Sequence, residues 1–173
     1  AGEGMLPVDV ARNARQQGLE VVVFSIGASQ KAELKTLANG QYHDITPGLL
    51  DKNFALLRQT QITHLVFAGK VNKWILFKNP KMDRRALEAF NALRHRNDDS
   101  VMLGAIKLLE AEGVHVLPQT DFLQDHFLPA QVLTERHPTP EEQNDIEYGL
   151  QIAKEMGRLD IGQTIVLAQS MLL

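Results

Sequence analysis

Apolar residues recur with two different periods along this chain, and the two periods alternate. From residue 6 to residue 17 they return every three or four positions, which predicts a helix ended by Gly18. The next stretch, "LEVVVFSIG", is a β-branched run closed by Gly27, which predicts a strand. Helical spacing then returns over residues 31–37. The chain thus begins with the alternation that is typical of an α/β protein.

The same alternation continues further along the chain. Helices are predicted for "LLDKNFALLRQTQ", for residues 82–94 and for "DDSVMLGAIKLLEAEG", and strands for "THLVFAG" and "VHVL". The uninterrupted apolar core of "THLVFAG" indicates a strand buried on both faces, as in a parallel sheet. The opening "AGEG" has the character of a strand exit. We therefore expect a parallel α/β sheet whose first strand is missing from the sequence.

A change of pattern divides the chain into two regions. Periodicity is lost in "PAQVLTERHPTP", which carries three prolines and predicts a linker over residues 129–140. We expect one domain over residues 1–128 and the beginning of a second α/β domain over residues 141–173. The final "TIVLAQSMLL" stops in the middle of a pattern, so the second domain is expected to be truncated.

The second region opens with strong helix signals. Thr139 and Glu142 have the spacing of a capping box, and Pro140 suits the first helical position. The predicted helix runs to Met156, and the residues expected on its inner face are Ile146, Leu150 and Ala153. "GRLDIGQ" is then expected to lead into a strand.

Composition narrows the classes of function. The chain has 173 residues, of which 44% are apolar and 23% charged, as in an ordinary globular protein. A net charge of −3 predicts no general attraction to nucleic acid, so no nucleic-acid partner is expected. The absence of cysteine excludes disulfides, thiolate nucleophiles and cysteine metal sites.

Two predicted strand exits carry the candidate phosphate-binding residues. In "AGEG", Gly2 and Gly4 precede a helix, where backbone N–H groups and the helix dipole favour an anion. The alternative is an ordinary tight turn, because the full G-x-G-x-x-G pattern is not present. In "FAGKVNK", Gly69 permits close approach of a ligand, and Lys70 and Asn72 follow. The alternative there is a solvated loop. Both exits should line the same crevice.

Two further places carry weaker candidates. Asp98 and Asp99 could hold Mg²⁺ together with substrate oxygens, or could simply cap the helix that they begin. Gln163, in "GRLDIGQ", belongs to a polar group at a helix-to-strand turn. That group either faces a cleft or braces the turn. A Rossmann oxidoreductase is one alternative function, but no acidic residue ends "VVVFS" to bind a ribose. A non-catalytic lipid or nucleotide-sugar binder is another.

Five segments in this order, "AGEGMLP", "FAGKVNK", "FKNPKMDRRAL", "RNDD" and "EMGRLDIGQTIVL", resemble one family. The chain is similar over its whole length to the UDP-2,3-diacylglucosamine pyrophosphatases of the LpxI type. The resemblance implies a Rossmann-like N-terminal domain, a linker and a C-terminal domain particular to the family. It also implies a hydrolase that cleaves the pyrophosphate of UDP-2,3-diacylglucosamine into UMP and 2,3-diacylglucosamine 1-phosphate (lipid X), a step of lipid A biosynthesis.

The resemblance carries further expectations about cofactor, location and site. It implies a divalent cation, typically Mg²⁺, and a cytoplasmic enzyme in peripheral contact with the inner membrane. A homodimer is among the expected assemblies. The family's essential aspartate belongs to an R-V-D-L-P segment that this sequence does not contain, so no catalytic residue is assigned. The expected substrate-binding residues are Gly2, Gly4, Gly69, Lys70, Asn72 and Gln163, and the expected metal ligands are Asp98 and Asp99.

Overall fold

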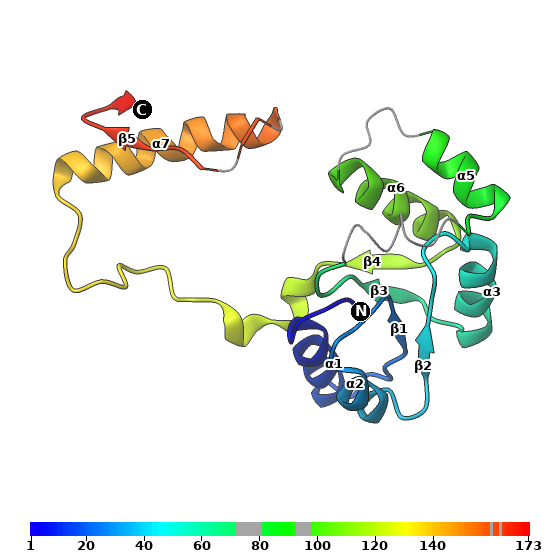
Figure 1. The fold of residues 1–173 in the computed structure, drawn as a ribbon. Helices are drawn as coiled ribbons and strands as arrows, with labels where there is room; N and C mark the ends of the chain where they lie inside the picture. The colour runs from blue at the N-terminus through cyan, green and yellow to red at the C-terminus, as the bar shows by residue number, and fades with distance from the viewer. Residues whose placement is uncertain (72–80, 93–97, 160, 163) are drawn as a thin grey trace. The chain divides into compact units, whose positions relative to one another are not determined.

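The computed structural model describes residues 1–71, 81–92, 98–159, 161–162 and 164–173. These residues form two compact units, Ala1–Phe127 and Leu128–Leu173. The first unit contains two pairs of parallel strands with helices around them (Figure 1). The second unit consists mainly of one long helix and a short hairpin. Each unit is described on its own below.

The first unit alternates helices with short strands. Val23–Ser25 (β1) pairs in parallel with Tyr42–Asp44 (β2), and His64–Val66 (β3) pairs in parallel with His115–Leu117 (β4). The helices are α1 (Leu6–Gln16), α2 (Lys31–Leu37), α3 (Leu50–Thr60), α5 (Arg84–Asn91) and α6 (Asp98–Ala111), followed by the 3₁₀ turns η1 (Gln119–Phe122) and η2 (Gln124–His126). The predicted mixed α/β class with parallel strands is confirmed.

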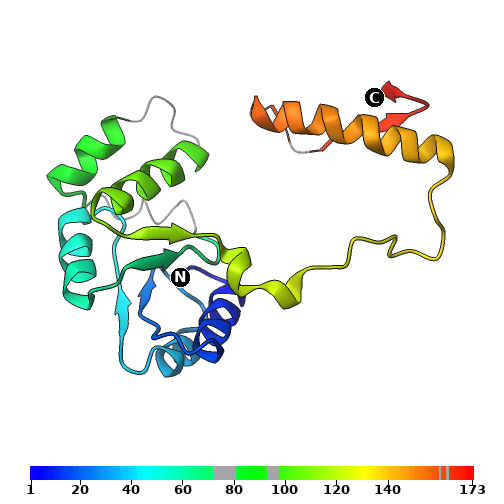
Figure 2. The ribbon, with the colours of Figure 1, turned by 180° about the vertical axis from the view of Figure 1, so that it is seen from behind.

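Three clusters of buried side chains hold the described part of this unit together. One joins α1, β1 and α2 around Val8, Val23 and Leu34. A second joins α1 to the turn at Phe122. The third joins α3, the end of α6 and the segment before β4. Figure 2, which shows the same ribbon from behind, confirms that α1 and α2 lie beside β1 and β2, whereas α5 and α6 lie beyond β3 and β4.

Charged side chains bind the third cluster to its surface helices. The Glu112 carboxylate accepts hydrogen bonds from Arg85 and from Arg58, each at 2.6 Å. The hydrogen bond from Arg85, with that from Arg58, holds the pKa of Glu112 below its usual value. Arg85 also lies over the ring of Phe54, 4.3 Å from the ring centre. One cation on α5 therefore contacts both the core of α3 and the acid after α6.

The Asp83 carboxylate accepts hydrogen bonds from the first turns of two helices. It accepts a hydrogen bond from the Ala86 amide in α5 at 2.8 Å and from the Asp51 amide in α3 at 2.7 Å. Each bond satisfies an amide that has no partner inside its own helix. The backbone N–H of Asp83 donates to the Gly48 carbonyl, so the segments before both helices are also joined.

The second unit is built on α7 (Pro140–Arg158). The predicted capping box is present, because the Thr139 hydroxyl accepts from the Glu142 amide and the Glu142 carboxylate accepts from the Thr139 amide. The hairpin of β5 (Leu167–Ala168) and β6 (Met171–Leu172) is antiparallel. Its turn residue Ser170 is held to α7 by a 2.7 Å hydrogen bond from the Ser170 amide to Asp145.

The structure corrects two expectations about elements. The strand β2 was not predicted, because "YHD" is short and polar, yet its backbone pairs with β1 over three residues. Ile146 and Leu150 were predicted to point inward but are exposed on this unit, whereas Gly149 is buried against Ile165 and Leu167. Ala153, the third residue predicted to point inward, is partly buried, but Ile146 and Leu150 lie off the stripe on which the hairpin packs, which contains Gly149.

Candidate functional site

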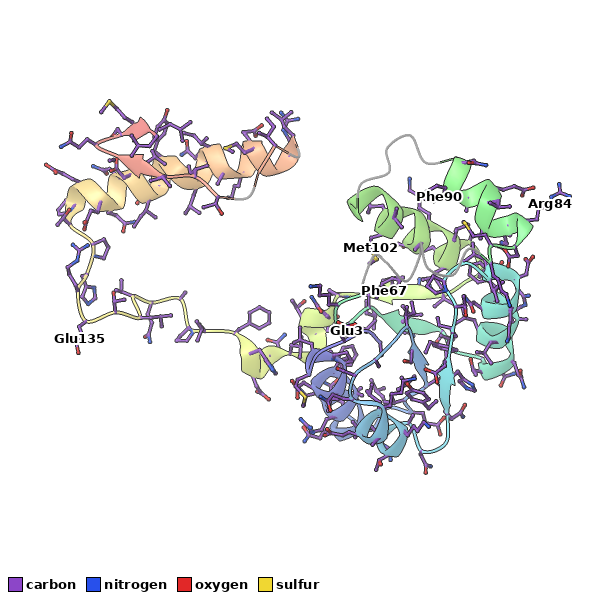
Figure 3. All side chains as sticks on the ribbon, viewed as in Figure 1. Glu3, Phe67, Arg84, Phe90, Met102 and Glu135 are labelled. Carbon is purple, nitrogen blue, oxygen red and sulfur yellow. The ribbon has the colours of Figure 1, made fainter. Side chains whose placement is uncertain are left out.

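The two predicted strand exits meet in one backbone bridge. Glu3 and Lys70 form an isolated antiparallel bridge, with the Glu3 amide donating to the Lys70 carbonyl at 2.7 Å and the Lys70 amide to the Glu3 carbonyl at 3.0 Å. The Gly2 amide donates to the Ala68 carbonyl at 2.9 Å. "AGEG" and "FAGK" therefore share one edge of the unit, as their positions after predicted strands indicated. Figure 3 labels Glu3 and Phe67, one residue from each of these two segments.

Two glycines make this close approach sterically possible. A Cβ atom on Gly2 would lie 2.4 Å from the Lys70 carbonyl oxygen, and one on Gly69 would lie 2.7 Å from the Glu3 carbonyl oxygen. Gly69 also has φ +84°, in the left-handed region that favours glycine. Glycine at these positions is thus required by contact between two backbones, and "FAGK" turns sharply at the point where it leaves the strand.

A third strand exit contributes to the same edge. The Gly4 amide donates to the Ser29 hydroxyl at 3.0 Å, and the buried Ser25 hydroxyl at the end of β1 accepts from the Ala28 amide at 3.2 Å. Sequence reasoning missed Ser25 and Ser29 as parts of the site. The signal was the run "SIGAS", rich in small residues, at the end of a predicted strand, which is typical of a turn that lets chains approach.

The hydrogen bonds decide which donors remain for a ligand. The amides of Gly2, Glu3, Gly4 and Lys70 are all engaged within the protein, so Gly2 and Gly4 shape the turn. Among the described residues, no acceptor lies opposite the amides of Met5, Leu6 and Gly69. Met5 and Leu6 are at the start of α1, where free amides and the helix dipole favour an anion.

Lys70 supplies the cation of this edge. Its side chain is exposed, and it forms no ion pair within the described residues, although it faces Glu3 across the bridge. By contrast, Lys31 at the start of α2 is paired with Asp44 at 3.0 Å. The Lys31 ammonium holds the pKa of Asp44 below its usual value. Lys70 is therefore the cation on the bridge that is left to meet a phosphate.

Four of the predicted site residues cannot be placed. Asn72 and Gln163 lie outside the described residues. Asp98 and Asp99 begin α6 in the backbone, but their side chains lie outside the described part. In the described part of the chain, no three His, Asp or Glu side chains are grouped as a ready metal site. The positions that the structure does describe, Gly2, Gly4, Gly69 and Lys70, are brought together.

These features define an α/β protein that gathers glycine turns, helix-start amides without a partner among the described residues, and one lysine at the ends of parallel strands. The chain belongs to the LpxI family, because residues 1–126 match the LpxI N-terminal domain and residues 129–173 match the LpxI C-terminal domain. A UDP-2,3-diacylglucosamine pyrophosphatase LpxI from Caulobacter vibrioides is 28% identical over 176 residues. That similarity covers 100% of this chain and 61% of the relative, so the chain spans about three fifths of the relative's length.

Within the described ranges, no helix combines the length and the apolar content that crossing a bilayer requires.

Proposed function

We propose that this chain belongs to an enzyme that hydrolyses the pyrophosphate of UDP-2,3-diacylglucosamine to UMP and 2,3-diacylglucosamine 1-phosphate. The membership of both regions in the LpxI family carries this proposal. The name of the Caulobacter relative, a UDP-2,3-diacylglucosamine pyrophosphatase, indicates the substrate. The bridge between Glu3 and Lys70 supports a phosphate site at this edge of the chain.

The reaction requires water to add to one phosphorus while the bond from that phosphorus to the bridging oxygen breaks. Attack at either phosphorus gives the same two products. Negative charge on the phosphoryl oxygens must be stabilised, and fixed donors do this with little reorganisation. We assign this role to the ammonium of Lys70 and to the amides of Met5, Leu6 and Gly69. Gly2 and Gly4 contribute by keeping the backbone narrow at the point of approach.

Mg²⁺ forms part of the proposal. Bound Mg²⁺ would neutralise pyrophosphate oxygens and orient the water. It commonly binds through one or two carboxylates together with substrate phosphates. The exposed Glu3 carboxylate on the bridge fits that chemistry, and Asp98 and Asp99 stay candidates from the sequence. No residue described here is assigned the part of general base.

Location and partners follow from the substrate. We propose a cytoplasmic enzyme that meets its diacylated substrate, and releases lipid X, at the surface of the inner membrane. A homodimer is the assembly to be tested. Asn72 and Gln163 stay proposed substrate contacts.

Release of UMP from UDP-2,3-diacylglucosamine with Mg²⁺, with and without chelator, tests the function. We expect UMP to form only when the cation is present. The Lys70→Ala variant should lose roughly tenfold or more in kcat/KM, as expected for a charge-assisted hydrogen bond. Lys52→Ala, on the exposed surface of α3, is the control, and its kcat/KM should equal that of the parent protein. Absence of UMP in every condition, with substrate still bound, would instead support a non-catalytic binder.

A further inference from the structure

Two histidine side chains lie next to each other on the strand pair β3–β4 of the first unit (Figure 1). His64 begins β3 and His115 begins β4, and the two residues are partners in the parallel register of these strands. Partners in register project from the same face of a sheet. The ring centres are 5.7 Å apart, and the ring planes are tilted by 41°. Both residues are exposed, so an ion in solution can reach the two rings.

The distance between the two rings suits a single shared metal ion. Two imidazoles that bind the same tetrahedral ion have ring centres roughly 5–6 Å apart, because each metal–nitrogen bond is about 2.0–2.1 Å long. The observed separation of 5.7 Å lies within that range. The tilt between the planes allows one nitrogen of each ring to point toward a common position, whereas rings stacked in parallel keep their nitrogens apart.

A hydrogen bond with the preceding residue prepares the His64 ring. The Thr63 hydroxyl lies 2.9 Å from Nδ1 of His64, so Nδ1 is engaged within the protein and Nε2 is the nitrogen left for a metal. When the Nδ1 proton is donated to this hydroxyl, Nε2 carries the lone pair that a metal requires. A second-nitrogen hydrogen bond of this kind fixes the ring of a metal-binding histidine and makes the ligating nitrogen more basic. The Thr63 carbonyl also accepts from the His115 amide at 2.9 Å, so Thr63 contacts both histidines.

The other histidines that the structure describes have different surroundings. His43 stacks on Phe24, with ring centres 5.7 Å apart, and His126 lies 3.4 Å from the Asp9 carboxylate. His137 is exposed in the segment before α7. Within the described part of the chain, His64 and His115 are therefore the histidines whose rings contact each other.

The histidine pair is separate from the candidate phosphate site. His64 and His115 lie at the amino ends of their strands, whereas the bridge of Glu3 and Lys70 lies beyond the carboxyl end of β3. The ligand chemistry also differs. Mg²⁺ prefers oxygen ligands, whereas neutral imidazole nitrogens suit Zn²⁺, Cu²⁺ and Ni²⁺. The pair thus points to a different ion at a different end of the strands.

We propose that His64 and His115 form a two-histidine site for a divalent transition metal ion, such as Zn²⁺, that joins β3 to β4. His64 binds through Nε2, and His115 supplies one nitrogen of its ring. Thr63 is a positioning residue that holds the His64 ring. Water occupies the remaining positions on the ion, so we expect weaker binding than at a structural site with four protein ligands. An ion that binds the paired strands and not the separated ones stabilises the first unit.

Titration of the nucleotide-free chain with Zn²⁺, followed by the histidine ring resonances, tests the proposal. We expect the His64 and His115 rings to shift together, with one ion per chain, and the thermal midpoint to rise. His64→Gln and His115→Gln should each weaken binding roughly tenfold or more, because one imidazole of the pair is lost. His137→Gln is the matched control and should bind as the parent does. Thr63→Val keeps both rings and should weaken binding by a smaller factor.

Three results would each overturn the proposal. These are a shift of only one of the two rings or of neither, the same affinity in the parent and in both variants of the pair, and an equal loss of affinity in His137→Gln. The ring resonances of the parent give a decision even if a variant folds poorly. Neither Mg²⁺ nor nucleotide is present in the titration, so the result is independent of the proposed hydrolysis.

Discussion

The two units of this protein hold their helices in different ways. In the first unit, helices and strands bury side chains in three clusters, and residues such as Leu34 and Phe54 are 1% and 3% exposed. In the second unit, no described hydrophobic side chain is fully buried, and Ile146, Leu150 and Ile161 are exposed. A complete capping box nevertheless starts α7. Local signals can therefore define a helix, whereas a core needs several elements to cover one another.

Truncation of a buried side chain should show the largest difference in stability between the two units. Phe54→Ala removes a ring that packs among Leu57, Leu109 and Val114 and lies under Arg85. We expect the free energy of unfolding of the first unit to fall by about 3–5 kcal/mol. Ile146→Ala, on the exposed face of α7, should stay within about 0.5 kcal/mol of the parent. Urea unfolding followed by amide resonances of each unit measures both values.

The bridge at the candidate site should be sensitive to a single methyl group. Gly69→Ala places a Cβ 2.7 Å from the Glu3 carbonyl oxygen, in addition to the strain of φ +84°. Gly113→Ala is the matched control, since it has φ +80° and nothing within 4 Å of the added atom. We expect Gly113→Ala to cost about 1 kcal/mol and Gly69→Ala about 2–4 kcal/mol of unfolding free energy. Equal losses in urea unfolding would show that the bridge tolerates the added atom.

The first unit should also lose stability on mild acidification. Burial lowers the pKa of the Ala1 amino group from its ordinary value of 8.0 to about 6 in the folded chain. The unfolded chain therefore binds the proton more readily between pH 6 and 8, so stability is full above pH 8 and falls as pH decreases toward 6. The expected loss is about 2 kcal/mol. Acetylation of the Ala1 nitrogen should remove this part of the pH dependence, and identical pH profiles with and without the acetyl group would contradict the prediction.

In the second unit, stronger acid should destabilise only the first turn of α7, and by less than mild acid destabilises the first unit. The hydrogen bond from Arg136, with that from the Thr139 amide, lowers the pKa of Glu142 to about 2. Its stabilising effect is present above the ordinary carboxyl range and is lost as pH falls toward 2. Carbon chemical shifts in the first turn of α7 should report fraying over that range. Glu142→Ala, which removes the side-chain acceptor, should fray this turn already at neutral pH, whereas Glu141→Ala should not, and equal behaviour of the two variants would exclude the capping role.

Local patterns in the sequence predicted most of the elements and the meeting of two strand exits. Helical spacing, Gly18 and the Thr139 capping box act within a few residues, so they can be recognised without the fold. Parallel topology predicted that "AGEG" and "FAGK" line one crevice, and the Glu3–Lys70 bridge shows that the two segments do meet. Contacts between residues far apart in the sequence could not be predicted from these local patterns. β2 exists because β1 pairs with it, and Gly149 is buried because a hairpin packs on it.

The structure was also needed to show what each residue of the candidate site does. Gly2 and Gly4 were expected to offer their amides to phosphate, but both amides bond within the protein. Ser29 is drawn into the site by the Gly4 amide, across 25 positions of sequence. Which amides stay free depends on this pairing, and pairing between distant segments leaves no periodic trace in the chain.

Binding of UMP to the chain tests the central claim, that the bridge of Glu3 and Lys70 holds the phosphates. Calorimetric titrations at low and high salt compare the parent with Lys70→Gln and with Lys52→Gln. We predict that Lys70→Gln weakens binding roughly tenfold or more at low salt, that added salt narrows the difference, and that Lys52→Gln binds as the parent does. The same dissociation constant for all three proteins at both salt concentrations would contradict it.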